Sequence, residues 1–199
     1  MQYDDRLFEN RNDGRGAWTI RWLLRRYEGR SPWNFCWRIT LEQYAAAILI
    51  GLFIAGAYAV LGIPLFEDDQ SFEYGSDGQP SEHGGSAELL GMIVLVSYMI
   101  AIGPVLETLT LQALPIIIAR KFKAQLGMQV LISGTLFAAG HFTNPNSILS
   151  GFAAGIPGGL YLGFAFAYWQ RGSPATAWWV TFVSHGLRNV LPTIAMIAA

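Results

Sequence analysis

The fold is decided by a stretch in the second half of the chain, residues 124–170, which reads AQLGMQVLISGTLFAAGHFTNPNSILSGFAAGIPGGLYLGFAFAYWQ. This stretch contains no Asp, Glu, Lys or Arg. A water-facing surface cannot be built from such residues, whereas a lipid-facing surface can. Only 14% of the 199 residues are charged and 52% are hydrophobic, whereas soluble domains carry about 25% charged residues. We therefore predict an integral membrane protein.

Apolar runs recur along the chain, and each is long enough for a membrane-spanning helix of about 20 residues. The five predicted spans are 44–66, 89–119, 126–142, 148–169 and 175–199. The second run is too long for one straight crossing, and we expect Gly103-Pro104 to break it because proline removes a backbone donor. The predicted fold class is all-α: a polytopic membrane helical bundle of about five transmembrane segments with an N-terminal interfacial helix.

The N-terminal part of the chain differs in composition from the rest. Residues 17–43 mix Trp, Leu and Arg without reaching the hydrophobicity of a span, which is typical of a cationic helix at the lipid headgroups. Alternatively, this cationic segment binds an anionic partner. We therefore expect a cytoplasmic or interfacial segment over 1–43 and a transmembrane domain over 44–199, whose core at 89–199 carries the motifs described below. The first forty residues lack an apolar core followed by a cleavage site, so we expect no cleaved signal peptide.

Charges between the runs predict the orientation of the chain. The basic residues cluster before residue 40, at 120–123 and at Arg171, whereas the loop 67–86 is acidic and contains no Lys or Arg. Lys and Arg are enriched in cytoplasmic loops. We expect the N-terminus in the cytoplasm, the acidic loop outside, and the protein in the plasma (inner) membrane.

The fourth run carries small residues at a regular spacing of four. These are Gly151, Gly155, Gly159, Gly163 and Ala167. Such a spacing places them on one ridge of a helix, where another helix backbone can approach closely. The pattern predicts helix packing and no chemistry.

Four ionisable residues lie within the apolar runs: Glu107, His141, His185 and Arg188. Such a side chain costs about 2.5–3.5 kcal/mol in a membrane-spanning helix and usually marks function. The structural alternative is a polar cluster that joins helices, with a Glu107–Arg188 ion pair as its simplest form.

Neighbouring residues refine the hypothesis. In a helix, Phe137 shares a face with His141, and Asn189 shares a face with His185. A carboxylate can take a proton from a water held by a histidine, while a second histidine and an amide stabilise the oxyanion of a tetrahedral intermediate. The same Glu107, His141 and His185 could instead hold Zn²⁺. The chain has no basic nucleic-acid stripe, so we expect the bilayer and a membrane-associated peptide or protein as partners.

Three motifs in chain order resemble those of the CPBP intramembrane proteases, the Abi family of CAAX prenyl endopeptidases and bacteriocin-processing proteins. They are Glu107-x-x-x-x-Gln112, Phe137-x-x-x-His141 and His185-x-x-x-Asn189. The resemblance implies that Glu107 activates the water and that His141 holds it. It also implies that His185 and Asn189 form the oxyanion site, in a glutamate-type or metal-dependent endopeptidase whose substrate is membrane-associated and can be prenylated.

The first motif departs from the family pattern, which is commonly Glu-Glu-x-x-x-Arg. Thr108 and Gln112 stand at its second and last positions. Because an isolated carboxylate is disfavoured in a low-dielectric site, we expect Arg188 to replace the missing cation. Arg188 would then support Glu107 directly, through one water or through Asn189. Two other functions remain open: a non-catalytic membrane scaffold or immunity factor, and a small transporter or proton relay.

Overall fold

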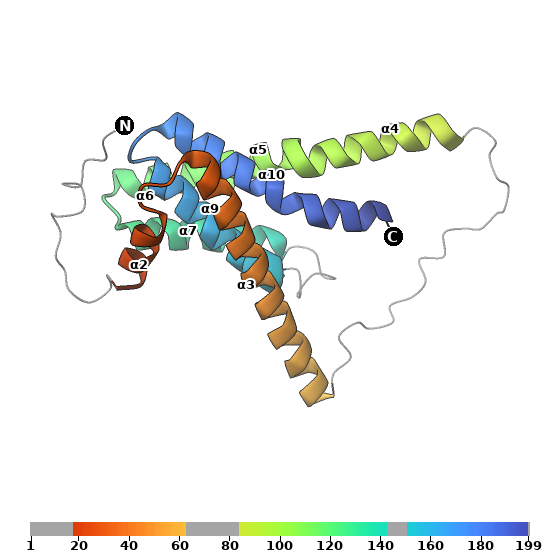
Figure 1. Ribbon diagram of the computed structural model, residues 1–199, viewed down its shortest axis with the longest axis horizontal. Helices are drawn as coiled ribbons and strands as arrows, with labels where there is room; N and C mark the ends of the chain where they lie inside the picture. Colours follow the sequence, from red (N-terminus) through yellow and green to blue (C-terminus); the bar gives the residue numbers. More distant parts are fainter. Residues whose placement is uncertain (1–17, 63–83, 143–150, 199) are drawn as a thin grey trace.

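The computed structural model describes residues 18–62, 84–142 and 151–198, with the side chains of 18–21 and 84–88 left out (Figure 1). Every element in the described part is helical, so the predicted all-α class is confirmed there. The α-helices are α2 (Trp18–Tyr27), α3 (Pro32–Leu61), α4 (Gly84–Ser97), α5 (Gly103–Glu107), α6 (Leu114–Lys121), α7 (Leu126–His141), α9 (Ile156–Trp169) and α10 (Pro174–Ala198). The described part also contains three π-helical turns: η1 (Tyr98–Ile102) between α4 and α5, η2 (Thr108–Ala113) between α5 and α6, and η4 (Gly151–Gly155) directly before α9.

Within the described residues, two helices are long and apolar enough to cross a membrane: α3, and the continuous helix from Leu89 to Lys121. The other predicted spans fall on α7, η4–α9 and α10. Helix α7 has 16 residues, fewer than the ~20 that cross a bilayer core, and α10 carries buried polar residues along its length, so the five predicted spans are not all confirmed. The predicted start at residue 148 and most of the loop 67–86 lie outside the described residues.

Helix α3 begins twelve residues before the predicted span, at Pro32 rather than at residue 44. The Ser31 side chain accepts a hydrogen bond from the Asn34 backbone N–H at 3.3 Å, and Pro32 occupies the first turn, where its missing N–H costs nothing. Gly62 closes the helix in a left-handed conformation with φ 67°. The predicted boundary at residues 43 and 44 therefore falls inside one helix, and α2 is a separate helix before it.

The second predicted span is not broken at Gly103-Pro104. Pro104 has no N–H to donate to the carbonyl of Ile100, four residues earlier. The helix widens by one residue instead, and the Gly103 N–H bonds to the carbonyl of Tyr98. A π-helical turn accommodates the proline, and helical structure continues through it to Lys121.

Helix α9 lies at the centre of the packed helices, in contact with α7, α10 and α3. Its glycine ridge faces α7, as the four-residue spacing predicts. A Cβ atom at Gly159 would lie 3.0 Å from the Gly134 Cα, and one at Gly155 would lie 2.9 Å from the His141 Cβ. The glycines therefore set the close approach of the two backbones that positions His141.

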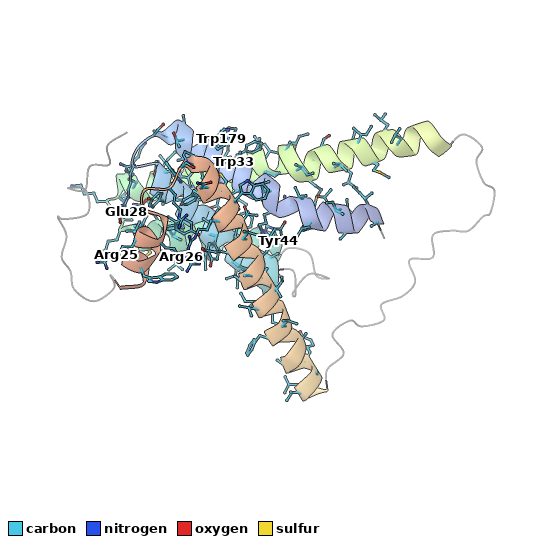
Figure 2. All side chains as sticks on the ribbon, in the orientation of Figure 1. Arg25, Arg26, Glu28, Trp33, Tyr44 and Trp179 are labelled. Carbon is cyan, nitrogen blue, oxygen red and sulfur yellow. The ribbon has the colours of Figure 1, made fainter. Side chains whose placement is uncertain are left out.

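Helix α2 is fastened to α3 through the carboxylate of Glu42. Arg26 Nε and Arg38 Nε donate to Glu42 Oε1 at 2.8 and 3.1 Å, and the Tyr27 hydroxyl donates to Oε2 at 2.7 Å. Burial of the phenol, together with this hydrogen bond, raises the pKa of Tyr27 well above its usual range. In Figure 2, Arg26 lies between α2 and the first turns of α3. The cationic helix predicted from the sequence is thus held against the packed helices.

The last turns of α3 and the first turns of α4 extend away from the packed helices (Figure 1). Large apolar side chains there are exposed, including Phe53 at 78%, Val60 at 88% and Leu90 at 62%. Water disfavours so much continuous apolar surface, whereas lipid does not. The exposed apolar side chains thus lie on the same two helices that are long and apolar enough to span a membrane.

Candidate active site

The π-helical turn η1 provides the contact that sets the position of α10. Because the Gly103 N–H bonds five residues back, the carbonyl of Met99 is released from the helix, and Asn189 Nδ2 donates to it at 2.8 Å. Gly186 faces the carbonyl of Ile100 so closely that a Cβ atom would lie 3.0 Å from the oxygen. Helix α10 therefore docks on backbone groups that Pro104 and the π turn expose.

This docking places His185 beside Glu107. His185 Nε2 lies 3.5 Å from Glu107 Oε2, with the two residues on different helices and 78 positions apart in the sequence numbering. The His185 side chain is 2% exposed, whereas that of Glu107 is 36% exposed. One carboxylate oxygen faces the buried histidine, and the rest of the Glu107 side chain can be reached from outside the packed helices.

Two polar atoms of this pair lack hydrogen-bond partners. Glu107 Oε2 and His185 Nδ1 are both buried, and neither bonds to any described residue. Several other buried side-chain atoms, among them the Thr108 hydroxyl, also lack partners, but this pair alone among them combines a carboxylate with an imidazole, the groups of general acid–base chemistry. The pair is therefore the best candidate for chemistry in the described part of the chain.

The fully buried ring of Phe137 gathers three of the predicted site residues. The His141 ring stacks on it with 4.5 Å between centroids and 28° between planes, as predicted from their shared helix face. The His185 ring approaches its edge at 5.4 Å, and the Arg188 Cζ lies 5.6 Å from its centroid. Phe137 is thus the centre around which both histidines and the arginine are arranged.

The protonation pattern of His141 follows from its hydrogen bond. His141 Nδ1 lies 3.0 Å from the carbonyl oxygen of Phe137. A carbonyl oxygen only accepts hydrogen bonds, so Nδ1 carries the proton. Nε2 of the neutral ring is then an acceptor, which suits a group that holds a water molecule by one of its hydrogens.

Arg188 does not reach Glu107 by two of the three expected routes, the direct contact and the bridge through Asn189. Its Nη2 donates to the carbonyl of Ala154 at 2.6 Å, and its guanidinium lies flat against Gly158, where any Cβ atom would collide with it. Glu107 and Arg188 attract each other electrostatically, but the described residues include no direct ion pair between them. The amide of Asn189 is directed at Met99 and does not bridge the two charges.

Thr108 and Gln112 are both fully buried. Gln112 Oε1 accepts a hydrogen bond from Ser133 on α7, and the same hydroxyl lies 2.9 Å from the carbonyl of Leu111. That carbonyl is released because Pro115, four residues later, has no N–H. Gln112 thus joins the long helix to α7, and the Thr108 hydroxyl has no partner among the described residues.

Sequence reasoning missed the groups that meet these released carbonyls. Ser133 is one of these groups. Tyr44 is another: its hydroxyl donates to the carbonyl of Arg188 at 2.6 Å. That carbonyl has no helical donor because Pro192, four residues later, lacks an N–H. Figure 2 shows Tyr44 on the side of α3 that faces α10. One feature of the sequence does indicate them. A proline inside an apolar run leaves the carbonyl four residues earlier without its usual N–H donor, so another group must supply the hydrogen bond.

The alternative metal site is not assembled in this geometry. Within residues whose positions are described, no three His, Cys, Asp or Glu side chains gather as ligands for one ion. Glu107, His141 and His185 therefore do not form a ready Zn²⁺ ligand set, and no step is assigned to a metal.

Comparison of the chain with family models, with curated proteins and with solved structures finds no match. The described part of the chain is all-helical and contains two helices long and apolar enough to span a membrane. It also contains a cluster in which His141, His185 and Arg188 gather around Phe137, with Glu107 beside His185.

Proposed function

We propose that this chain is an intramembrane endopeptidase that hydrolyses a peptide bond of a membrane-associated protein or peptide. The observation that carries the proposal is the 3.5 Å approach of Glu107 Oε2 to His185 Nε2, between two helices rich in apolar residues. An ionisable pair of this kind is costly in a membrane and usually marks function. The motif order Glu107, His141, His185 and its resemblance to the CPBP proteases support the same assignment.

In this mechanism Glu107 removes a proton from a water molecule held by His141 Nε2. The water oxygen attacks the carbonyl carbon, and the carbonyl electron pair moves to oxygen, giving a tetrahedral oxyanion. The oxyanion then collapses, the C–N bond breaks, and Glu107 returns the proton to the leaving amine. The part of Glu107 that is exposed gives water and substrate access to this base.

The proposal includes a membrane arrangement finer than the two candidate spans. α7, η4–α9 and α10 would complete about five spans, and the N-terminus and α2 would lie on the cytoplasmic side of the plasma membrane. The basic residues at 120–123 and the exposed Trp33 and Trp37 at 49% and 45% support this placement, because such residues concentrate at the cytoplasmic interface and the headgroup level. Cysteines introduced within 67–86 should then react with an impermeant reagent only from outside.

A non-catalytic scaffold of the same fold is the second candidate. The hydrogen bonds of Asn189 to Met99 and of Arg188 to Ala154 favour it, because they show two of the polar residues joining helices. A scaffold would keep its biological effect when Glu107 is replaced. A transporter would instead produce solute or ion flux in liposomes.

The experiment is an unbiased cleavage assay on the purified protein in lipid nanodiscs, using a library of membrane-anchored peptides. We expect Glu107→Gln to lower the cleavage rate by at least ~10²-fold, the usual worth of general acid–base catalysis. Glu28→Gln is the matched control, since Glu28 is exposed at the end of α2. Equal cleavage by wild type and Glu107→Gln would refute the proposal, and parallel assays with chelator and with added Zn²⁺ would assign the glutamate or metallo type.

A further inference from the structure

Both residues expected to stabilise the oxyanion are directed elsewhere in this structure. The His185 Nε2 faces the carboxylate of Glu107, and the Asn189 amide donates to the carbonyl of Met99. A tetrahedral intermediate in a low-dielectric site still needs a group that offsets its negative charge. Another donor must therefore supply that charge if Glu107 acts as the base.

Arg188 is the cation in this cluster that can offset the negative charge of the oxyanion. It is 8% exposed, and its guanidinium lies against the same Phe137 ring that His185 touches. A guanidinium has several N–H donors in a fixed plane. Among the described residues its side chain meets one acceptor, the carbonyl of Ala154, and no carboxylate within ion-pair distance.

The backbone of α9 is shaped to hold this guanidinium in place. A Cβ atom at Gly158 would lie 2.7 Å from Arg188 Nη2 and closer still to its Cζ and Nη1. Glycine is therefore required at 158 for the observed position, and the bond to Ala154 fixes it from the next turn. A charged group held rigidly before the reaction stabilises a transition state without a reorganisation cost.

The charge balance of the reaction agrees with this placement. Before attack, the site contains the Glu107 carboxylate and the Arg188 cation. When Glu107 accepts the proton of water, its charge is lost and one negative charge appears on the substrate oxygen. The cation then faces the oxyanion in place of the carboxylate, so the net charge of the buried site stays constant.

We propose that Arg188, seated on Gly158 and Ala154, is the residue that donates hydrogen bonds to the oxyanion in this protein. The inference rests on the proposed function and adds to it a residue at a variable position of the third motif, between His185 and Asn189. Arg188 thus acts on the developing substrate charge, and any support it gives to Glu107 is indirect.

The test separates transition-state from ground-state interactions. The probes are the best-cleaved library peptide and its phosphinate analogue, which carries a tetrahedral anionic centre in place of the scissile amide. We expect Arg188→Leu to lower kcat by about 10²–10³-fold with KM nearly unchanged, and to weaken phosphinate inhibition by a similar factor. Arg188→Lys should restore part of both, because it keeps the charge but not the planar fork.

Gly158→Ala provides a second test that leaves the arginine in place. The added methyl group displaces the guanidinium, so kcat and phosphinate inhibition should fall together while Arg188 remains charged. Gly56→Ala is its control, because a Cβ atom at this exposed glycine meets nothing within 4 Å.

The outcomes are distinguishable. A folded Arg188→Leu protein with unchanged kcat and unchanged phosphinate inhibition overturns this inference and leaves the proposed function standing. A wild-type protein that cleaves no peptide, or cleaves equally as Glu107→Gln, overturns both. If Arg188→Leu fails to fold, the Gly158→Ala and Arg188→Lys results decide.

Discussion

Replacement of Asn189 by Ala tests whether this amide serves structure or chemistry, because the two roles predict effects of very different size. In the structure Asn189 Nδ2 donates at 2.8 Å to the Met99 carbonyl that the π turn releases. Hydrogen bonds between helices in membranes contribute about 0.6–2 kcal/mol each. A donor to an oxyanion is instead worth about 10²–10³-fold in kcat.

We therefore expect Asn189→Ala to lower the free energy of unfolding by about 1 kcal/mol and to reduce kcat by less than about 10-fold. Unfolding is measured by titrating detergent-solubilised protein with SDS, and kcat with the best-cleaved library peptide. The control is Asn34→Ala, which removes an amide from the exposed first turn of α3. A loss of 10²-fold or more in kcat with unchanged stability would refute this reasoning and return Asn189 to the oxyanion site.

Three further predictions concern stability. Ser133→Ala removes the hydroxyl that donates to Gln112 Oε1 and lies 2.9 Å from the carbonyl of Leu111, and should destabilise the protein by about 1–3 kcal/mol, measured in the same SDS titration. Gly159→Ala forces a methyl group against the backbone of α7 and should cost about 1–3 kcal/mol, whereas Gly56→Ala should be neutral or stabilising. Burial raises the pKa of Tyr27 in the folded protein above its ordinary value of about 10. The stability that the neutral phenol gives the fold is therefore complete below about pH 10 and declines as the pH rises above it. Tyr27→Phe should therefore lose less stability than wild type between neutral and strongly alkaline pH, and an identical loss in both proteins would contradict the assignment.

The sequence determined the helical, lipid-compatible character of the chain, because length, hydropathy and proline or glycine placement act locally and add along the chain. It also identified the polar residues that a membrane disfavours and the glycine ridge on α9, since four-residue spacing defines one helix face whatever the partner. The stacking of Phe137 on His141 follows from the same local geometry.

Only the tertiary structure decided which of those polar groups meet. The choice of His185 rather than Arg188 as the neighbour of Glu107 depends on the rotation and depth of α10. The rotation and depth of α10 are set by two backbone carbonyls that have no helical donor, those of Met99 and Arg188. Asn189 and Tyr44, which lie 90 and 144 positions away from them in the sequence, donate hydrogen bonds to these carbonyls. The sequence marks such carbonyls only through a nearby proline and does not specify the donor. Long-range packing selects the donor, and with it the partner of each charge in the site.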